Sequence, residues 1–130
     1  MITGKEMFVG TDIVEVERIK RAISHWKHDF LNRVFTAREV SKINAETPDY
    51  QRAAGLWAAK ESMVKAIGLG FRNGISFQDV EVEYDEYGCP YFILRGRLKE
   101  IVAEKGKAKI SLSISHCQNY AIAVVAVTHD

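Results

Sequence analysis

The hydrophobic period of this 130-residue chain changes once, near Gly68 and Gly70, and this change constrains the fold more than any other feature. Before it, apolar residues recur every three or four positions, as on one face of an α-helix. After it, apolar and polar residues alternate, as in half-buried strands. The chain therefore needs a helical part and a sheet part that pack on each other, which is an α+β fold.

The helical part follows a short β-rich segment over 8–14, which we expect to be a strand. Apolar residues at helical spacing predict a first helix over 16–26. The segment 36–39, Thr-Ala-Arg-Glu, fits a capping box and predicts the start of a second helix.

A long central helix is predicted over 48–67. Thr47 fits its N-cap, with Pro48 as the first helical residue. Either Gly68 or Gly70 is expected to end it.

The sheet part is predicted to contain four strands joined mostly by short turns. Short connections favour antiparallel pairing, so we expect an antiparallel sheet with a long central helix and shorter packing helices. The predicted elements are strands over 80–84, 90–95, 110–114 and 120–127, a helix from Leu98 that ends at Gly106, and turns over 85–88 and 115–119.

Length and composition indicate one globular domain over 1–130, with 47% hydrophobic and 27% charged residues and no repeat or low-complexity linker. The net charge of +1 gives no overall attraction to nucleic acid or to an anionic membrane. The longest apolar run, over 120–127, is far shorter than the about 20 residues of a membrane helix. The N-terminus lacks a signal-peptide pattern. Cys89 and Cys117 form no metal-binding or disulfide pattern, so we expect a cytoplasmic protein.

The central helix carries a carboxylate on an apolar face. At 100° per residue, Glu61 falls on the stripe formed by Tyr50, Ala54, Trp57 and Val64. A buried carboxylate is costly without a compensating cation or proton. Lys65 lies one turn further on. One interpretation is an ordinary surface pair, worth about 0.2–0.5 kcal/mol; the other is a functional carboxylate and ammonium.

A second carboxylate, Asp12, lies in the predicted first strand, where Asp is uncommon. It either caps the following helix or serves a site. If Asp12 and Glu61 converge, they need a cation between them. Two carboxylates with water and substrate phosphates are the usual way in which proteins hold Mg²⁺. Lys65 would then suit a phosphate.

Three further segments give weaker signals. Ser113, Ser115 and His116, at the end of a strand, are either structural or could contact an anionic group. The segment 68–70, Gly-Leu-Gly, first of all ends a helix, although its amides could also contact phosphate. Arg18, Arg21 and His25 share one side of the first helix, which is either a solvated face or a dock for an acidic partner.

Taken together, these segments resemble the holo-[acyl-carrier-protein] synthases of the 4'-phosphopantetheinyl transferase superfamily. The central stretch, with Trp-Ala-Ala-Lys-Glu and a lysine four residues after the Glu, is the most specific. The four stretches that carry the resemblance are 9–19, 30–39, 54–68 and 112–123.

The resemblance implies transfer of the 4'-phosphopantetheine of coenzyme A to a serine of apo acyl carrier protein in fatty acid biosynthesis, with release of adenosine 3',5'-bisphosphate. It implies that Asp12 and Glu61 hold Mg²⁺ and that Lys65 acts on the leaving phosphate. Coenzyme A would be positioned by Ser115, His116 and Lys65, and the carrier would dock on Arg18 and Arg21. It also implies a homotrimer with sites between protomers.

The chain departs from this family at Leu56, where many relatives have a basic residue. Whether this chain makes the phosphate contact expected of that residue is therefore left undecided by the sequence. Two alternatives stay open as well. The same transfer could act on a polyketide or peptide synthase carrier domain, or the chain could be a non-catalytic module that binds coenzyme A or a magnesium nucleotide. The charge balance and the acidic segment 81–86 disfavour nucleic acid as a partner.

Overall fold

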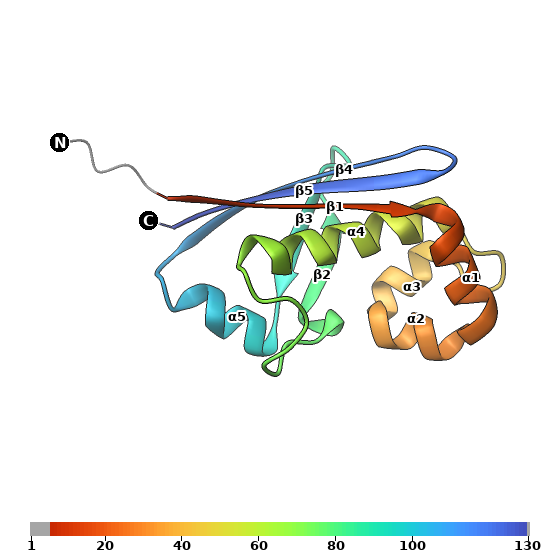
Figure 1. The fold of residues 1–130 in the computed structure, drawn as a ribbon, viewed down its shortest axis with the longest axis horizontal. Coiled ribbons are helices and arrows are strands. Elements are labelled where there is room, and N and C mark those ends of the chain that lie inside the picture. The colour runs from red at the N-terminus through yellow and green to blue at the C-terminus, as the bar shows by residue number, and fades with distance from the viewer. Residues whose placement is uncertain (1–5, 130) are drawn as a thin grey trace.

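A three-stranded antiparallel sheet forms one layer of the protein, and a long helix crosses one face of it (Figure 1). The computed structural model describes residues 6–129. The sheet has the strand order β1-β5-β4, so the first and last strands of the chain are neighbours. Its strands are β1 (Met7–Glu15), β4 (Ala108–His116) and β5 (Tyr120–His129). The helix is α4 (Tyr50–Ala66).

The remaining elements surround α4 on the side away from this sheet (Figure 1). Three short helices gather beside one end of α4, and a two-stranded sheet with a further helix lies beyond it. The helices are α1 (Val16–Trp26), α2 (His28–Val34), α3 (Ala37–Ile43) and α5 (Gly96–Ala103), with a 3₁₀ turn, η1 (Phe77–Asp79). The two-stranded sheet is β2 (Val80–Tyr84) with β3 (Pro90–Leu94).

The contact between α4 and the three-stranded sheet is very close. A Cβ atom at Gly10 would lie 1.9 Å from the Ser62 carbonyl oxygen and 2.6 Å from the Ala66 nitrogen. At the other end of the helix, a Cβ at Gly55 would lie 3.0 Å from a methyl carbon of Ile114. Position 10 therefore accepts only glycine, because the atoms that a side chain would meet belong to backbone.

The α+β class, the antiparallel pairing and most of the predicted elements are confirmed. The capping box is present, with Thr36 and Glu39 each accepting from the other's backbone N–H. One difference lies in the sheet part, where the strands form two separate sheets. In the described residues no helix is long and apolar enough to cross a membrane.

Three local predictions are wrong. The central helix begins at Tyr50, and its N-cap is Asp49, which accepts from the Arg52 backbone N–H at 3.1 Å. Thr47 instead accepts from the Asn44 side-chain amide. Helix α2 was not predicted, because it is only seven residues long and follows α1 directly. Ser115, expected in a turn, lies within β4.

Candidate active site

Asp12 and Lys65 meet where strand β1 crosses the C-terminal half of α4. The Lys65 ammonium lies 2.8 Å from the Asp12 carboxylate and donates a further hydrogen bond to the Thr11 carbonyl at 3.1 Å. Asp12 is in the middle of the strand, paired with Ala123 of β5, and it alternates with the exposed Ile13. The capping interpretation of Asp12 is therefore wrong; the N-cap of α1 is Glu15, without a side-chain cap.

Glu61 lies one helical turn before Lys65 and is partly buried. Burial raises the pKa of Glu61, and the negative charge of Asp12 raises it further, while Lys65 and Arg18 oppose the shift. The charge of Asp12 therefore acts on Glu61, which is the condition under which the sequence analysis expects a cation between them. A carboxylate that is desolvated beside another carboxylate favours either a proton or a bound cation.

The residues present fit a divalent cation of the Mg²⁺ type. Mg²⁺ usually takes one or two carboxylates and completes its coordination with water and substrate phosphates. Asp12 and Glu61 supply such a pair. Within residues 6–129 no group of three or more His, Cys, Asp or Glu side chains could hold a metal by itself. A site with two protein carboxylates would therefore depend on oxygens from water and substrate.

An open hollow lies next to Lys65. It is lined by Lys65 and by the loop that follows α4, which contains Gly68, Leu69, Gly70, Phe71 and Arg72. Gly68 and Gly70 both have positive φ, 79° and 75°, so this tight turn relies on glycine. The hollow therefore has the predicted Gly-Leu-Gly segment, Arg72 and Lys65 around one space.

The opposite side of α4 carries a buried ion pair that the sequence reasoning missed. The Lys60 ammonium lies 2.8 Å from the Glu39 carboxylate of α3, and both side chains are 0% exposed. Lys60 also donates to the carbonyls of Phe77 and Val80, at 2.9 and 2.6 Å. Burial lowers the pKa of Lys60, and the Glu39 carboxylate opposes that shift. The sequence held one indication of this buried lysine, which is its position in an alanine-rich helical segment that includes Ala58 and Ala59.

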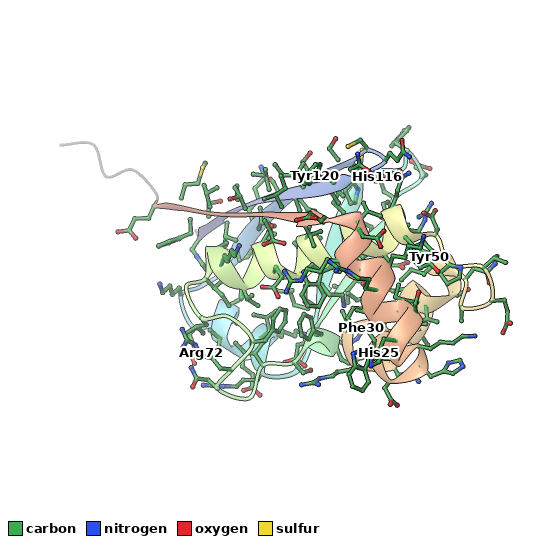
Figure 2. The ribbon with its side chains drawn as sticks, turned by 45° about the vertical axis from the view of Figure 1, so that its right-hand side comes forward. His25, Phe30, Tyr50, Arg72, His116 and Tyr120 are labelled. Atoms are coloured by element: carbon green, nitrogen blue, oxygen red, sulfur yellow. The ribbon has the colours of Figure 1, made fainter. Side chains whose placement is uncertain are left out.

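His116 and Ser115 lie on β4, which β5 separates from β1. Ile114 of β4 is in the same row of the sheet as Asp12, and Ser115 and His116 follow it one and two residues further on. His116 ends β4, and its Nδ1 is 3.0 Å from the side-chain oxygen of Gln51, in the first turn of α4. Gln51 and Lys65 are 14 residues apart, which is about 21 Å along a helix. Figure 2 shows His116 and Tyr120 near the tip of the β4–β5 hairpin. A single chain therefore does not bring His116 to Asp12 and Glu61.

The basic side of α1 is exposed beside this site. Arg18, Arg21 and His25 all face solvent, whereas Ile19 and Ile23 are buried. Arg18 is close enough to lower the pKa of Glu61. Figure 2 shows His25 on α1, well away from His116. Of the predicted docking residues, Arg18 thus lies near Glu61, and Arg21 is exposed on the same helix.

Leu56 is 1% exposed and belongs to the hydrophobic core. Position 56 therefore cannot contact a phosphate in this chain. Arg52, one turn earlier, is partly exposed and lies near Tyr84, at 5.9 Å from the ring centre.

Comparison with known proteins identifies the family of this chain. The family model described as 4'-phosphopantetheinyl transferase superfamily matches residues 8–125. The holo-[acyl-carrier-protein] synthase of Verminephrobacter eiseniae is 46% identical over 121 residues, which are 93% of this chain and 92% of that protein.

Solved structures agree as well. The holo-[acyl-carrier-protein] synthase of Neisseria meningitidis superposes with a TM-score of 0.84 at 31% identity, covering 95% of this chain and 98% of that one. The Helicobacter pylori enzyme in complex with coenzyme A gives a TM-score of 0.79 at 29% identity, covering 92% and 98%. The chain belongs to the 4'-phosphopantetheinyl transferase superfamily.

Proposed function

We propose that this protein is a holo-[acyl-carrier-protein] synthase that acts in fatty acid biosynthesis. It transfers the 4'-phosphopantetheine of coenzyme A to a serine of apo acyl carrier protein and releases adenosine 3',5'-bisphosphate. The observation that carries the proposal is the convergence of Asp12, Glu61 and Lys65 beside the exposed basic side of α1. The relatives at 46–47% identity carry that enzyme name.

Asp12 and Glu61 are proposed to hold Mg²⁺. The bound ion would neutralise charge on the pyrophosphate of coenzyme A, which is the main requirement of phosphoryl transfer. The raised pKa of Glu61 supports this assignment, because a cation relieves the repulsion that Asp12 exerts on it.

The reaction forms a bond from the serine oxygen to the phosphorus that carries the pantetheine and breaks the bond to the bisphosphate. Lys65 is proposed to donate to the oxygen that leaves, since its ammonium is half exposed beside Asp12. The serine proton passes either to Glu61 or to a water held by the carboxylates.

Arg18 and Arg21 are proposed to dock the carrier protein. Both are exposed on the α1 face that borders Glu61, so a carrier bound there presents its serine to the carboxylates. Charge complementarity at such a face mainly sets the rate and specificity of association.

The protein is proposed to be a homotrimer with shared sites. Ser115 and His116 are proposed to bind coenzyme A, yet β5 separates their strand, β4, from the strand that holds Asp12, so the neighbouring protomer would supply them. The sheet face opposite α4 supports association because it is apolar and exposed. That face includes Met7, Val9, Ile13, Tyr120, Ile122 and Val124, which are 40–66% exposed. Sedimentation at micromolar protein should show a trimer, and a clean monomer would contradict shared sites.

The cytoplasm is the proposed location, and the whole chain is proposed to act as one transferase domain. Cys89 and Cys117 are both exposed free thiols, which suits a reducing compartment.

The proposed function is tested by incubating the protein with coenzyme A, Mg²⁺ and apo acyl carrier protein and measuring the intact mass of the carrier. We expect a gain of one phosphopantetheine that a chelator abolishes. A carrier domain from a polyketide or peptide synthase, tested in parallel, reports the preferred substrate. If neither carrier gains mass while coenzyme A still binds, the protein is a binding module and the proposal is wrong.

A further inference from the structure

Glu61 is flanked in the chain by two fully buried polar residues, Lys60 and Ser62. Successive residues of a helix are 100° apart, so the two side chains leave α4 in directions 200° apart. Each makes hydrogen bonds to a different layer of the molecule. Lys60 reaches the layer of α3, η1 and β2, and Ser62 reaches the three-stranded sheet.

The Lys60 contacts are fixed by further bonds. Glu39, its carboxylate partner, accepts from the backbone N–H of Thr36 at 2.9 Å and from that of Val82 at 2.8 Å. The Lys60 ammonium therefore joins α4 to α3, to the 3₁₀ turn that contains Phe77, and to the start of β2 at Val80. The partners of Lys60 are therefore themselves fixed, because the Glu39 carboxylate is bonded to backbone N–H groups and the two carbonyls belong to the backbone of other elements.

Ser62 fixes the other side of the helix. Its hydroxyl donates to the carbonyl of Ala123 in β5 at 3.1 Å. Ala123 is the strand partner of Asp12. This hydrogen bond therefore fixes α4 against the residue that pairs with Asp12 in the sheet. The rest of this helix face is small, with Gly55, Ala59 and Ala66, and small apolar contacts alone define rotation poorly.

We propose that Lys60 and Ser62 are positioning residues that together fix the rotation of α4 about its axis, so that the Glu61 carboxylate is held toward Asp12. This inference rests on the metal site of the proposed function. Side-chain atoms lie about 5–6 Å from a helix axis, so a rotation of about 10° moves the carboxylate by about 1 Å. Displacements of that size are known to cost about a hundredfold in rate.

The test measures binding of Mn²⁺ alone to the full-length protein, by electron paramagnetic resonance of the free ion, for Lys60→Met and Ser62→Ala. We expect the dissociation constant to rise about tenfold in Lys60→Met and about threefold in Ser62→Ala. Lys60→Arg, which keeps the charge and the hydrogen-bond donors, should recover part of the affinity. In turnover, kcat should fall while the KM for carrier stays unchanged, because the α1 face is not altered.

Leu98→Ala is the matched control. Leu98 is 0% exposed in α5, so the variant loses stability through a core cavity and leaves both hydrogen-bonding residues of α4 in place. It should bind Mn²⁺ as the wild type does. A general loss of stability would instead weaken binding in Leu98→Ala as much as in Lys60→Met.

The outcomes separate the two proposals. If wild-type protein binds no Mn²⁺ either alone or with coenzyme A present, or if Glu61→Gln binds it equally well, the metal site of the proposed function is wrong. If wild type binds through Glu61 but Lys60→Met and Ser62→Ala match it in affinity and kcat, the positioning role is overturned. If circular dichroism shows Lys60→Met to be unfolded, Ser62→Ala decides the question alone.

Discussion

Helix α4 carries two lysine–carboxylate pairs with the same 2.8 Å separation, five residues apart, and they differ in almost everything else. Lys60 and Glu39 are both 0% exposed, and backbone groups supply their remaining hydrogen bonds. Lys65 and Asp12 are 51% and 14% exposed, so both can still take another ligand. The same two functional groups therefore fix a helix where they are enclosed and can meet a substrate where they are open.

The open pair has a third member, Glu61, and removing its charge should give the largest effect. Glu61→Gln is expected to lower Mg²⁺-dependent turnover by about 10²–10⁴-fold while the fold survives, because charge neutralisation and proton acceptance are both lost. The rate is read from the carrier's mass against time, with circular dichroism as the control for folding. Unchanged kinetics in Glu61→Gln would show that Glu61 is not part of the active site.

Replacing Lys60 and Lys65 separately by methionine tests whether the enclosed and the open ion pair differ in their contribution to stability. Lys60→Met leaves the buried Glu39 charge without its partner and should cost about 3–5 kcal/mol of the free energy of unfolding. Lys65→Met removes a half-exposed pair and should change stability by about 0–1 kcal/mol, while turnover falls about a hundredfold. Urea unfolding and turnover are measured on both proteins. Equal losses of stability would break the distinction between the enclosed and the open pair.

Charge reversal on α1 should have a smaller and more selective effect. Arg18→Glu with Arg21→Glu is expected to raise the KM for carrier protein about tenfold and to flatten its dependence on salt, since the attraction between unlike charges is lost. The KM for coenzyme A, measured at saturating carrier, serves as the internal control. A change confined to coenzyme A would refute the docking role.

The smallest expected effect is on the pH dependence of stability. Folded Glu61 has a pKa above the ordinary value of 4.5, so the folded protein binds more protons than the unfolded one between these two values. Stability should therefore fall as pH rises from about 4.5 through the folded pKa. With a chelator present, the Tm of Glu61→Gln should match wild type near pH 4 and exceed it at pH 7. A constant difference across this range would show that the Glu61 pKa is not raised.

The sequence predicted the open pair better than the enclosed one. Asp12 and Glu61 each break a local rule, because a carboxylate is unusual in a strand or on an apolar stripe, and such exceptions are visible in a sequence. Lys65 was noticed through its spacing of four residues from Glu61. Lys60 breaks no such rule in the sequence, since a lysine after two alanines is ordinary on a helix. Only the tertiary structure shows that it is enclosed.

The fold was predicted well where one face of an element is apolar. Helix α1 and the strands follow their periodic patterns, and their bounds lie within two residues of the predicted ones. The start of α4 was missed because Thr47 and Asp49 are both good N-cap residues, and the choice depends on the turn that Asn44 makes. The separation of the strands into two sheets is set by how α4 packs between them, which spacing does not encode.

The pairing of β1 with β5 has a consequence for synthesis on the ribosome. Asp12 is made early and Glu61 at mid-chain, but β1 has β5 as its strand partner, and β5 ends at His129. A nascent chain that already contains both carboxylates therefore lacks the strand that holds Asp12 against α4. The arrangement of Asp12 against α4 can form only after β5 has left the exit tunnel, so a chain that stops before β5 would carry both carboxylates without the strand that holds them together.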